Sequence, residues 1–130
     1  MTPSIFTRIA NGEIPCYKIA EDDHCLAFLD VNPLVPGHTL VIPKQQVDYI
    51  FDVEDDLLMK LHLFAKKVAL KMDRAIQCER IGVSVIGLEV PHAHIHLIPM
   101  NRVSDMDFSK PKIEISSEKM SELAERIAQS

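Results

Sequence analysis

The sequence predicts an α+β domain, with an antiparallel sheet of about five short strands, one long helix and short N- and C-terminal helices. Five short runs rich in Val, Ile, Leu and Phe are separated by turn-forming residues, as expected for strands. One stretch near the middle of the chain repeats apolar residues at helical spacing. The length of 130 residues suits one domain with its own core, so we expect a single domain over residues 1–130.

The first third of the chain is expected to form a short helix and three strands. Ser4 can cap a helix that ends at about Ala10, because Asn11-Gly12 is typical of a helix C-terminus. An acidic cluster and the later Asn-Pro and Pro-Gly turns separate the elements that follow. The expected strands are residues 17–20, 25–29 and 38–43.

The remaining elements begin with the long helix, which we expect over residues 54–76. Apolar side chains between Leu57 and Ile76 recur there at three- and four-residue spacing, and the lysines fall largely on the other side. Two more strands are expected, followed by a helix that Ser116 or Ser117 can cap. These elements span residues 81–86, 92–98 and 117–128.

Composition and charge exclude several classes of protein. The chain has 47% hydrophobic and 25% charged residues, which is typical of a soluble globular domain. The net charge is −5 and no dense Lys/Arg block occurs, so a nucleic-acid partner is not expected. No apolar run approaches the roughly 20 residues of a membrane span, and no secretory signal is visible. The three widely spaced cysteines indicate reduced thiols, so we expect a cytoplasmic protein. Because no long apolar run occurs, we expect no membrane partner.

Three histidines at alternate positions, His92, His94 and His96, are the most informative feature. On a strand this spacing places all three imidazoles on one face, roughly 7 Å apart. Three interpretations are open: a polar sheet face that happens to be rich in histidine, a metal site with His96 or Glu89 as third ligand, or catalysis by a histidine nucleophile. Successive strand positions diverge, which disfavours the metal site.

The pattern His-φ-His-φ-His-φ-φ over residues 92–98, where φ is apolar, resembles the signature of the histidine triad (HIT) superfamily of nucleotide-binding hydrolases and transferases. Residues 5–15 are similar to the opening helix and turn of that family. Residues 23–33 and 37–44 are similar to its next two strands, and the long helix lies where the family has one. The resemblance implies a HIT-like fold.

The resemblance also implies a role for each matching residue. His94 corresponds to the nucleophile that takes the nucleotidyl group. His96 would contact the bridging or leaving atom, and His92 would support His94 through the hydrogen-bond network. His38 would join this cluster, and Asp30 would hold the ribose hydroxyls. The slot for the base would be formed by Ile5, Phe6, Ile9, Phe28 and Val31.

Residue type alone gives some of these positions simpler explanations. Phe6, Ile9 and Phe28 are typical of a hydrophobic core, and Asp30 is typical of a turn. The segment from residue 101 to the C-terminus carries no readable motif. Within it Met106, Asp107 and Phe108 are expected to pack rather than to line a substrate entrance. Of all the candidate site residues, only the three triad histidines indicate a functional site from their residue type and spacing alone.

The segment before the triad departs from the family pattern. Residues 82–91 are shorter than usual by several positions and contain no Asn. Leu88 stands roughly where the family has Gln, and Glu89 brings a negative charge near the expected phosphate. These differences affect the expected contacts to the leaving group, and they leave the nucleophile in place.

The resemblance implies a hydrolase that releases a nucleoside 5′-phosphate, most simply AMP, from an amine or phosphate leaving group through a nucleotidyl-histidine. Such an enzyme would need no cofactor and no catalytic metal, and it would be a homodimer. Zinc-carrying relatives have cysteines near the first helix, where this chain has Ser4, Ile5 and Thr7, so no structural zinc is expected. Two alternatives stay open: a regulatory module that binds purine nucleotides without significant turnover, and a histidine-metal hydrolase.

Overall fold

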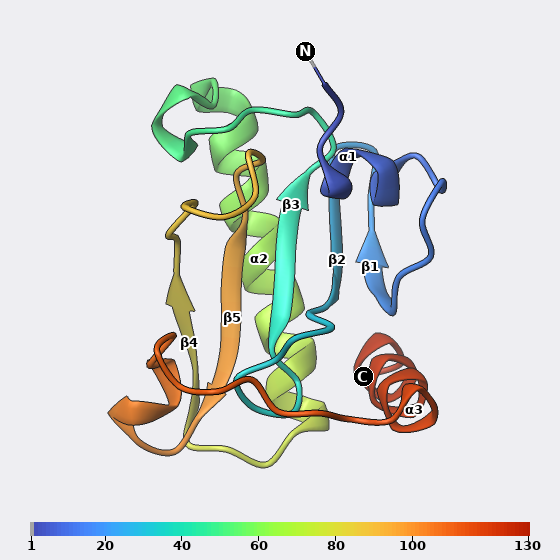
Figure 1. Ribbon diagram of the computed structural model, residues 1–130, viewed down its shortest axis with the longest axis vertical. Helices are drawn as coiled ribbons and strands as arrows, with labels where there is room; N and C mark the ends of the chain where they lie inside the picture. Colours follow the sequence, from blue (N-terminus) through green and yellow to red (C-terminus); the bar gives the residue numbers. More distant parts are fainter. Residues whose placement is uncertain (1) are drawn as a thin grey trace.

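The computed structural model describes residues 2–130 and confirms the predicted α+β fold (Figure 1). In this part of the chain five antiparallel strands form one sheet in the order β1-β2-β3-β5-β4. The strands are β1 (Lys18–Glu21), β2 (Cys25–Leu29), β3 (Thr39–Pro43), β4 (Arg80–Ser84) and β5 (Ile95–Met100). The helices are α1 (Ile5–Ala10), α2 (Asp55–Ala75) and α3 (Ser117–Ala128), with 3-10 turns at Ile50–Asp52 and Val103–Met106.

One face of the sheet packs against α2 and α3. The apolar stripe of α2, which includes Leu61, Val68 and Met72, is buried because it faces the sheet. α3 is capped by Ser116, whose hydroxyl accepts a hydrogen bond from the backbone amide of Lys119. Figure 1 shows α2 running behind the sheet and α3 below β1. The larger hydrophobic core therefore lies between the sheet and these two helices.

The opposite face of the sheet carries a smaller apolar cluster that is covered by short elements. α1 lies over it, together with the loop before β5 and the segment between β5 and α3 (Figure 1). The cluster consists of Phe6, Leu26, Phe28, Leu40 and Ile42. These short elements leave a cavity on this side of the sheet.

The strand predicted over residues 92–98 begins later, at Ile95. Its pairing with β3 starts at Val41, opposite Ile95. The preceding residues pair with loops instead, since the Ala93 amide donates to the Val47 carbonyl at 2.7 Å. His92 and His94 therefore precede the sheet, and the expectation that three imidazoles alternate on one strand face is wrong.

Most other predicted boundaries agree with the structure to within two residues. β2 and α3 have the predicted bounds, whereas β4 begins one residue earlier than predicted and ends two residues earlier. Within residues 2–130, none of the helices is both long enough and apolar enough to cross a membrane.

Candidate active site

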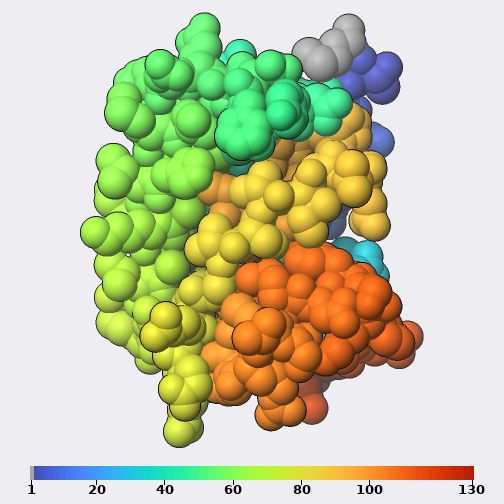
Figure 2. Space-filling view, turned by 90° about the vertical axis from the view of Figure 1, so that its left-hand side faces the viewer, coloured from blue at the N-terminus to red at the C-terminus, as the bar shows by residue number. Residues whose placement is uncertain are grey.

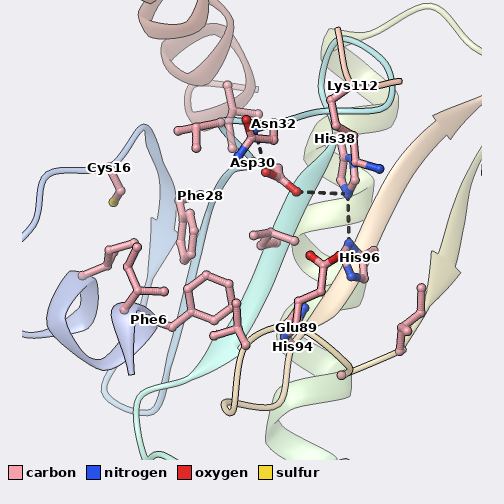
Figure 3. A pocket seen from close by; sticks show the side chains of 18 of the residues that line it. Phe6, Cys16, Phe28, Asp30, Asn32, His38, Glu89, His94, His96 and Lys112 are labelled. Atoms are coloured by element: carbon pink, nitrogen blue, oxygen red, sulfur yellow. Dashed lines mark hydrogen bonds and ion pairs between the residues drawn. The ribbon is translucent and has the colours of Figure 1, made fainter. Parts of the chain in front are cut away.

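The cavity has a volume of about 430 Å³ and lies between α1, β2, β3 and the loop before β5 (Figure 3). All predicted site residues except His92 line it. Figure 3 shows the aromatic side chains of Phe6 and Phe28 at one end and the histidines at the other. The lining residues used below are Ile5, Phe6, Ile9, Phe28, Asp30, Val31, His38, Glu89, His94, His96, Phe108 and Lys112.

His94 has one ring nitrogen fixed and the other free. Its Nδ1 lies 2.8 Å from the His92 carbonyl oxygen, which can only accept, so Nδ1 carries the proton of the neutral ring. Nε2 then holds a lone pair, has no hydrogen-bond partner in residues 2–130, and is not sealed from solvent. The ring packs edge-on against Phe6 and His96, with centroid distances of 5.0 and 4.9 Å. This geometry presents a nucleophilic nitrogen in an oriented ring.

The His92 ring is buried beside the cavity rather than in its wall. Its Nε2 donates to the Pro43 carbonyl at 2.7 Å, and its Nδ1 accepts from the Ser4 hydroxyl at 2.8 Å. Burial lowers the pKa of His92. The link to His94 is the His92 backbone carbonyl, so the ring anchors the loop that positions this carbonyl.

His38 and His96 form a directed chain of hydrogen bonds. The Leu34 amide donates to Nδ1 of His38 at 3.0 Å, so the proton of neutral His38 is on Nε2. That nitrogen lies 2.9 Å from Nδ1 of His96, which accepts, and the His96 proton is therefore on Nε2. Burial lowers the pKa of His38 to about 4 and that of His96 to about 3. Both rings are neutral near pH 7, and the chain leaves the Nε2–H of His96 free to donate.

Asp30 follows β2 and lies next to this chain. One carboxylate oxygen accepts from the Asn32 amide at 2.8 Å, and the other lies 3.6 Å from Nε2 of His38. Burial raises the pKa of Asp30, although the hydrogen bond from Asn32 opposes the shift. The residue thus makes the turn that its sequence context predicted, and it also presents a carboxylate to the cavity.

A HIT domain family model matches residues 11–103, which is most of the chain. The chain belongs to the HIT family. Adenosine 5′-monophosphoramidase hnt1 of Schizosaccharomyces pombe is 35% identical, with 95% of each chain covered. A HIT-like protein of Borreliella burgdorferi, described as uncharacterized, is also 35% identical over 98% of each chain. The crystal structure of a Hit-like protein from Bartonella henselae superposes with a TM-score of 0.84 at 31% identity, covering 97% of this chain and 94% of that one.

The apolar end of the cavity in this HIT protein is also part of its core. Phe6 and Phe28 are buried and pack edge-to-face with centroids 5.6 Å apart. Ile9 packs against the same cluster. Ile5 and Val31 lie at the mouth, 50% and 66% exposed. Phe6, Ile9 and Phe28 therefore belong to the core and also line the cavity, and their role in binding a base stays a prediction.

Two further residues line the cavity: Lys112, which the sequence analysis missed, and Phe108, which it expected to pack instead. The Phe108 ring packs edge-on against His96 at a centroid distance of 4.8 Å, so the expectation that it only packs away from the entrance is wrong. Lys112 lies over that ring, 5.5 Å from its centroid, and donates to the Phe108 carbonyl at 3.2 Å. The segment reaches the cavity because the Ile113 amide bonds to the Pro33 carbonyl at 3.0 Å. No local sequence motif predicts such a long-range contact.

The residues that could bind a metal ion in the structure differ from the triad histidines and Glu89, which the sequence analysis considered. Asp30, His38 and His96 each place one ligand atom within 4.8 Å of the others. In this arrangement His38 and His96 share a hydrogen bond, and an ion would have to displace the proton between them. The His92 ring points to Ser4 and Pro43, so a site made of the three triad rings does not form.

The positions where zinc-carrying HIT relatives have cysteines hold a hydrogen-bonded polar cluster. The Oε1 atom of Gln46 accepts from the Ser4 amide and from the Thr7 hydroxyl, both at 2.7 Å. The Ser4 hydroxyl completes the cluster by donating to His92. These hydroxyl and amide groups satisfy one another and offer no thiolate, which is what a structural zinc site uses. The absence of structural zinc stays a prediction.

Proposed function

We propose that this HIT protein is a nucleotidyl hydrolase that releases AMP from an adenosine 5′-phosphoramidate through a covalent intermediate on His94. The observation that carries the proposal is the fixed Nδ1–H of His94, which leaves the Nε2 lone pair open to the cavity. The relative from Schizosaccharomyces pombe, named an adenosine 5′-monophosphoramidase, supports the choice of substrate class.

In the first step Nε2 of His94 attacks the α-phosphorus in line with the leaving amine. The new N–P bond forms as the bond to the amine breaks, and the amine takes one proton from water. The imidazole becomes positively charged, and the His92 carbonyl that accepts from Nδ1–H stabilises this charge. The free Nε2–H of His96 donates to the leaving atom.

In the second step water attacks the same phosphorus from the side that the amine has left. The N–P bond to His94 breaks, AMP forms, and the water returns one proton to solvent. Splitting the substitution into two steps replaces one difficult reaction by two easier ones. The overall change is one phosphoramidate and one water to one amine and AMP.

The rest of the cavity supports recognition of a nucleoside. Asp30 offers two carboxylate oxygens, which suit the two hydroxyls of a ribose. Phe6 and Phe28 supply the apolar surface on which a purine packs. A regulatory module that binds the nucleotide without turnover is the second candidate, favoured by the Glu89 carboxylate in the wall near the triad.

A fluorogenic adenosine 5′-phosphoramidate tests the enzyme, assayed with and without EDTA. We expect turnover that survives EDTA, disappears in His94→Ala and persists in His62→Ala, which removes an exposed histidine of α2. Turnover lost in EDTA and restored by a metal would favour the histidine-metal hydrolase. AMP binding without turnover of any phosphoramidate would favour the regulatory module.

We also propose that the protein is a homodimer, formed by continuing the sheet at β4 or by packing α2 against its copy. β4 is an edge strand, and its Val83 is 60% exposed. α2 exposes Met59 and Leu63. Figure 2 shows β4 and α2 side by side on one face of the molecule. Light scattering after size exclusion should give a dimer, and Val83→Lys should shift it toward the monomer if the sheet is continued.

A further inference from the structure

The charged groups of the cavity are unevenly balanced. Two carboxylates line it, from Asp30 and Glu89, against one ammonium group, from Lys112. The hydrogen-bond chain through His38 and His96 gives each ring one donor and one acceptor nitrogen, so neither ring adds a positive charge. The described wall therefore carries one more negative than positive group, although a phosphate must bind there.

Glu89 stands at the end of the cavity where the reaction would occur. It lies in the loop between β4 and β5, three residues before His92 in the chain. Figure 3 shows its carboxylate on the side of His94 and His96, and the aromatic slot of Phe6 and Phe28 on the other side. The proposed reaction would place the base in that slot and the phosphate at His94, and the leaving group would then extend toward Glu89.

The charge of Glu89 is not neutralised by the part of the chain that the structure describes. No Lys, Arg or His of residues 2–130 lies within 4.0 Å of its carboxylate. Lys112 lines the same cavity, and its charge acts on Asp30, His38 and His96, but in residues 2–130 its ammonium lies over the Phe108 ring and forms no ion pair with Glu89. Burial is the main cause of the raised pKa of Asp30; Glu89 adds a small contribution in the same direction, weaker than the opposing effect of Lys112.

We propose that Glu89 makes the site selective for leaving groups that carry a positive charge, so that the preferred substrates are phosphoramidates of amines with a second, cationic group. An ammonium on the leaving group is attracted to the unpaired carboxylate. A carboxylate or phosphate there is repelled, which disfavours dinucleoside polyphosphates. The inference rests on the proposed function and narrows its substrate class.

The test uses three adenosine 5′-phosphoramidates whose alkylamine arms have equal length and end in an ammonium, a hydroxyl or a carboxylate. We expect kcat/KM of the unaltered protein to fall in that order. Because Glu89 is exposed, Glu89→Gln should reduce the ammonium-to-carboxylate ratio by only about two- to tenfold, the combined loss of one attraction and one repulsion, with the hydroxyl arm almost unaffected. High salt should reduce the preference of the unaltered protein.

Glu122→Gln is the matched control, because it removes the same charge from an exposed position on α3. Its arm preference should equal that of the unaltered protein. Glu89→Lys should reverse the order of the charged arms. If the hydroxyl arm is hydrolysed but the ratio is unchanged in Glu89→Gln, the inference is overturned and the proposed function stands. If the unaltered protein hydrolyses none of the three arms, the proposed function fails and the inference fails with it.

Discussion

The two ends of the cavity are held in place by different forces. At the apolar end Phe6 and Phe28 belong to a buried cluster on the sheet, so hydrophobic packing positions them. At the polar end hydrogen bonds to backbone groups orient His94 and His38. Under the proposed function, the side chains at the apolar end contribute both to stability and to nucleotide binding, whereas those at the polar end contribute to chemistry. Substitutions at the two ends should separate these properties.

The largest effect is expected at the polar end, from His94→Ala. Loss of the nucleophile should lower kcat by at least about 10³-fold. The free energy of unfolding should fall by about 1–3 kcal/mol, less than at the apolar end, because the buried His92 carbonyl loses the Nδ1–H of His94 as its donor. Stopped assays and urea unfolding of the same preparation measure both. A variant that keeps a tenth of its turnover would contradict the assignment of the nucleophile.

The apolar end should show the opposite behaviour in Phe28→Ala. Removing this buried ring should lower the free energy of unfolding by about 3–5 kcal/mol and weaken AMP binding. Val31→Ala is the control, since Val31 lines the same cavity but is 66% exposed, and it should change stability by less than about 0.5 kcal/mol. Urea unfolding and AMP titration measure the two variants. Equal free energies of unfolding of the two variants would contradict the claim that packing of Phe28 in the core contributes to stability.

The neutral histidine pair predicts how stability depends on pH. In the unfolded chain His38 and His96 take up protons below about pH 6.5, but in the fold burial lowers their pKa to about 4 and about 3. The unfolded state therefore binds more protons in this window, and stability falls as pH falls from about 6.5 through 4. The slope is at most about 1.4 kcal/mol per pH unit for each group. His38→Gln should flatten it, whereas His62→Gln, which alters an exposed ring, should not.

The smallest effect is expected at Ser4, which lies outside the cavity and joins α1 to the His92 ring. Ser4→Ala removes the cap of α1 and the hydrogen bond to the His92 ring, and should lower stability by about 1 kcal/mol. Turnover should also fall severalfold, because the His92 carbonyl that orients His94 becomes less fixed. Ser116→Ala removes a comparable cap from α3 without this link. A similar loss of turnover in Ser4→Ala and Ser116→Ala would contradict the claim that Ser4 positions His94 through His92.

The sequence predicted the elements that local patterns determine. The spacing of apolar residues located α2, and the serine caps located the starts of α1 and α3. Alternation failed at His92 and His94 because they precede the first residue that pairs with β3, Ile95, and the Ala93 amide between them bonds to the Val47 carbonyl of a loop. The histidines were still found, since their residue type and spacing identified the family.

The part of the site that the sequence did not reveal depends on long-range contacts. Phe108 and Lys112 follow β5 in an irregular segment, and they reach the cavity because Ile113 bonds to Pro33, 80 residues earlier in the chain. The direction of the His92 ring likewise depends on Ser4, 88 residues earlier in the chain. Contacts of this kind depend on the folded topology, which no local pattern encodes.

The central claim is that His94 forms the covalent intermediate, and trapping that intermediate tests it most directly. The protein is mixed with an adenosine 5′-phosphoramidate, quenched during turnover, digested, and analysed by mass spectrometry for the peptide that contains residues 92–98. We predict an adenylyl group on His94, absent from His94→Ala. Rapid turnover with no adduct at any quench time, or an adduct on another residue, would contradict the account.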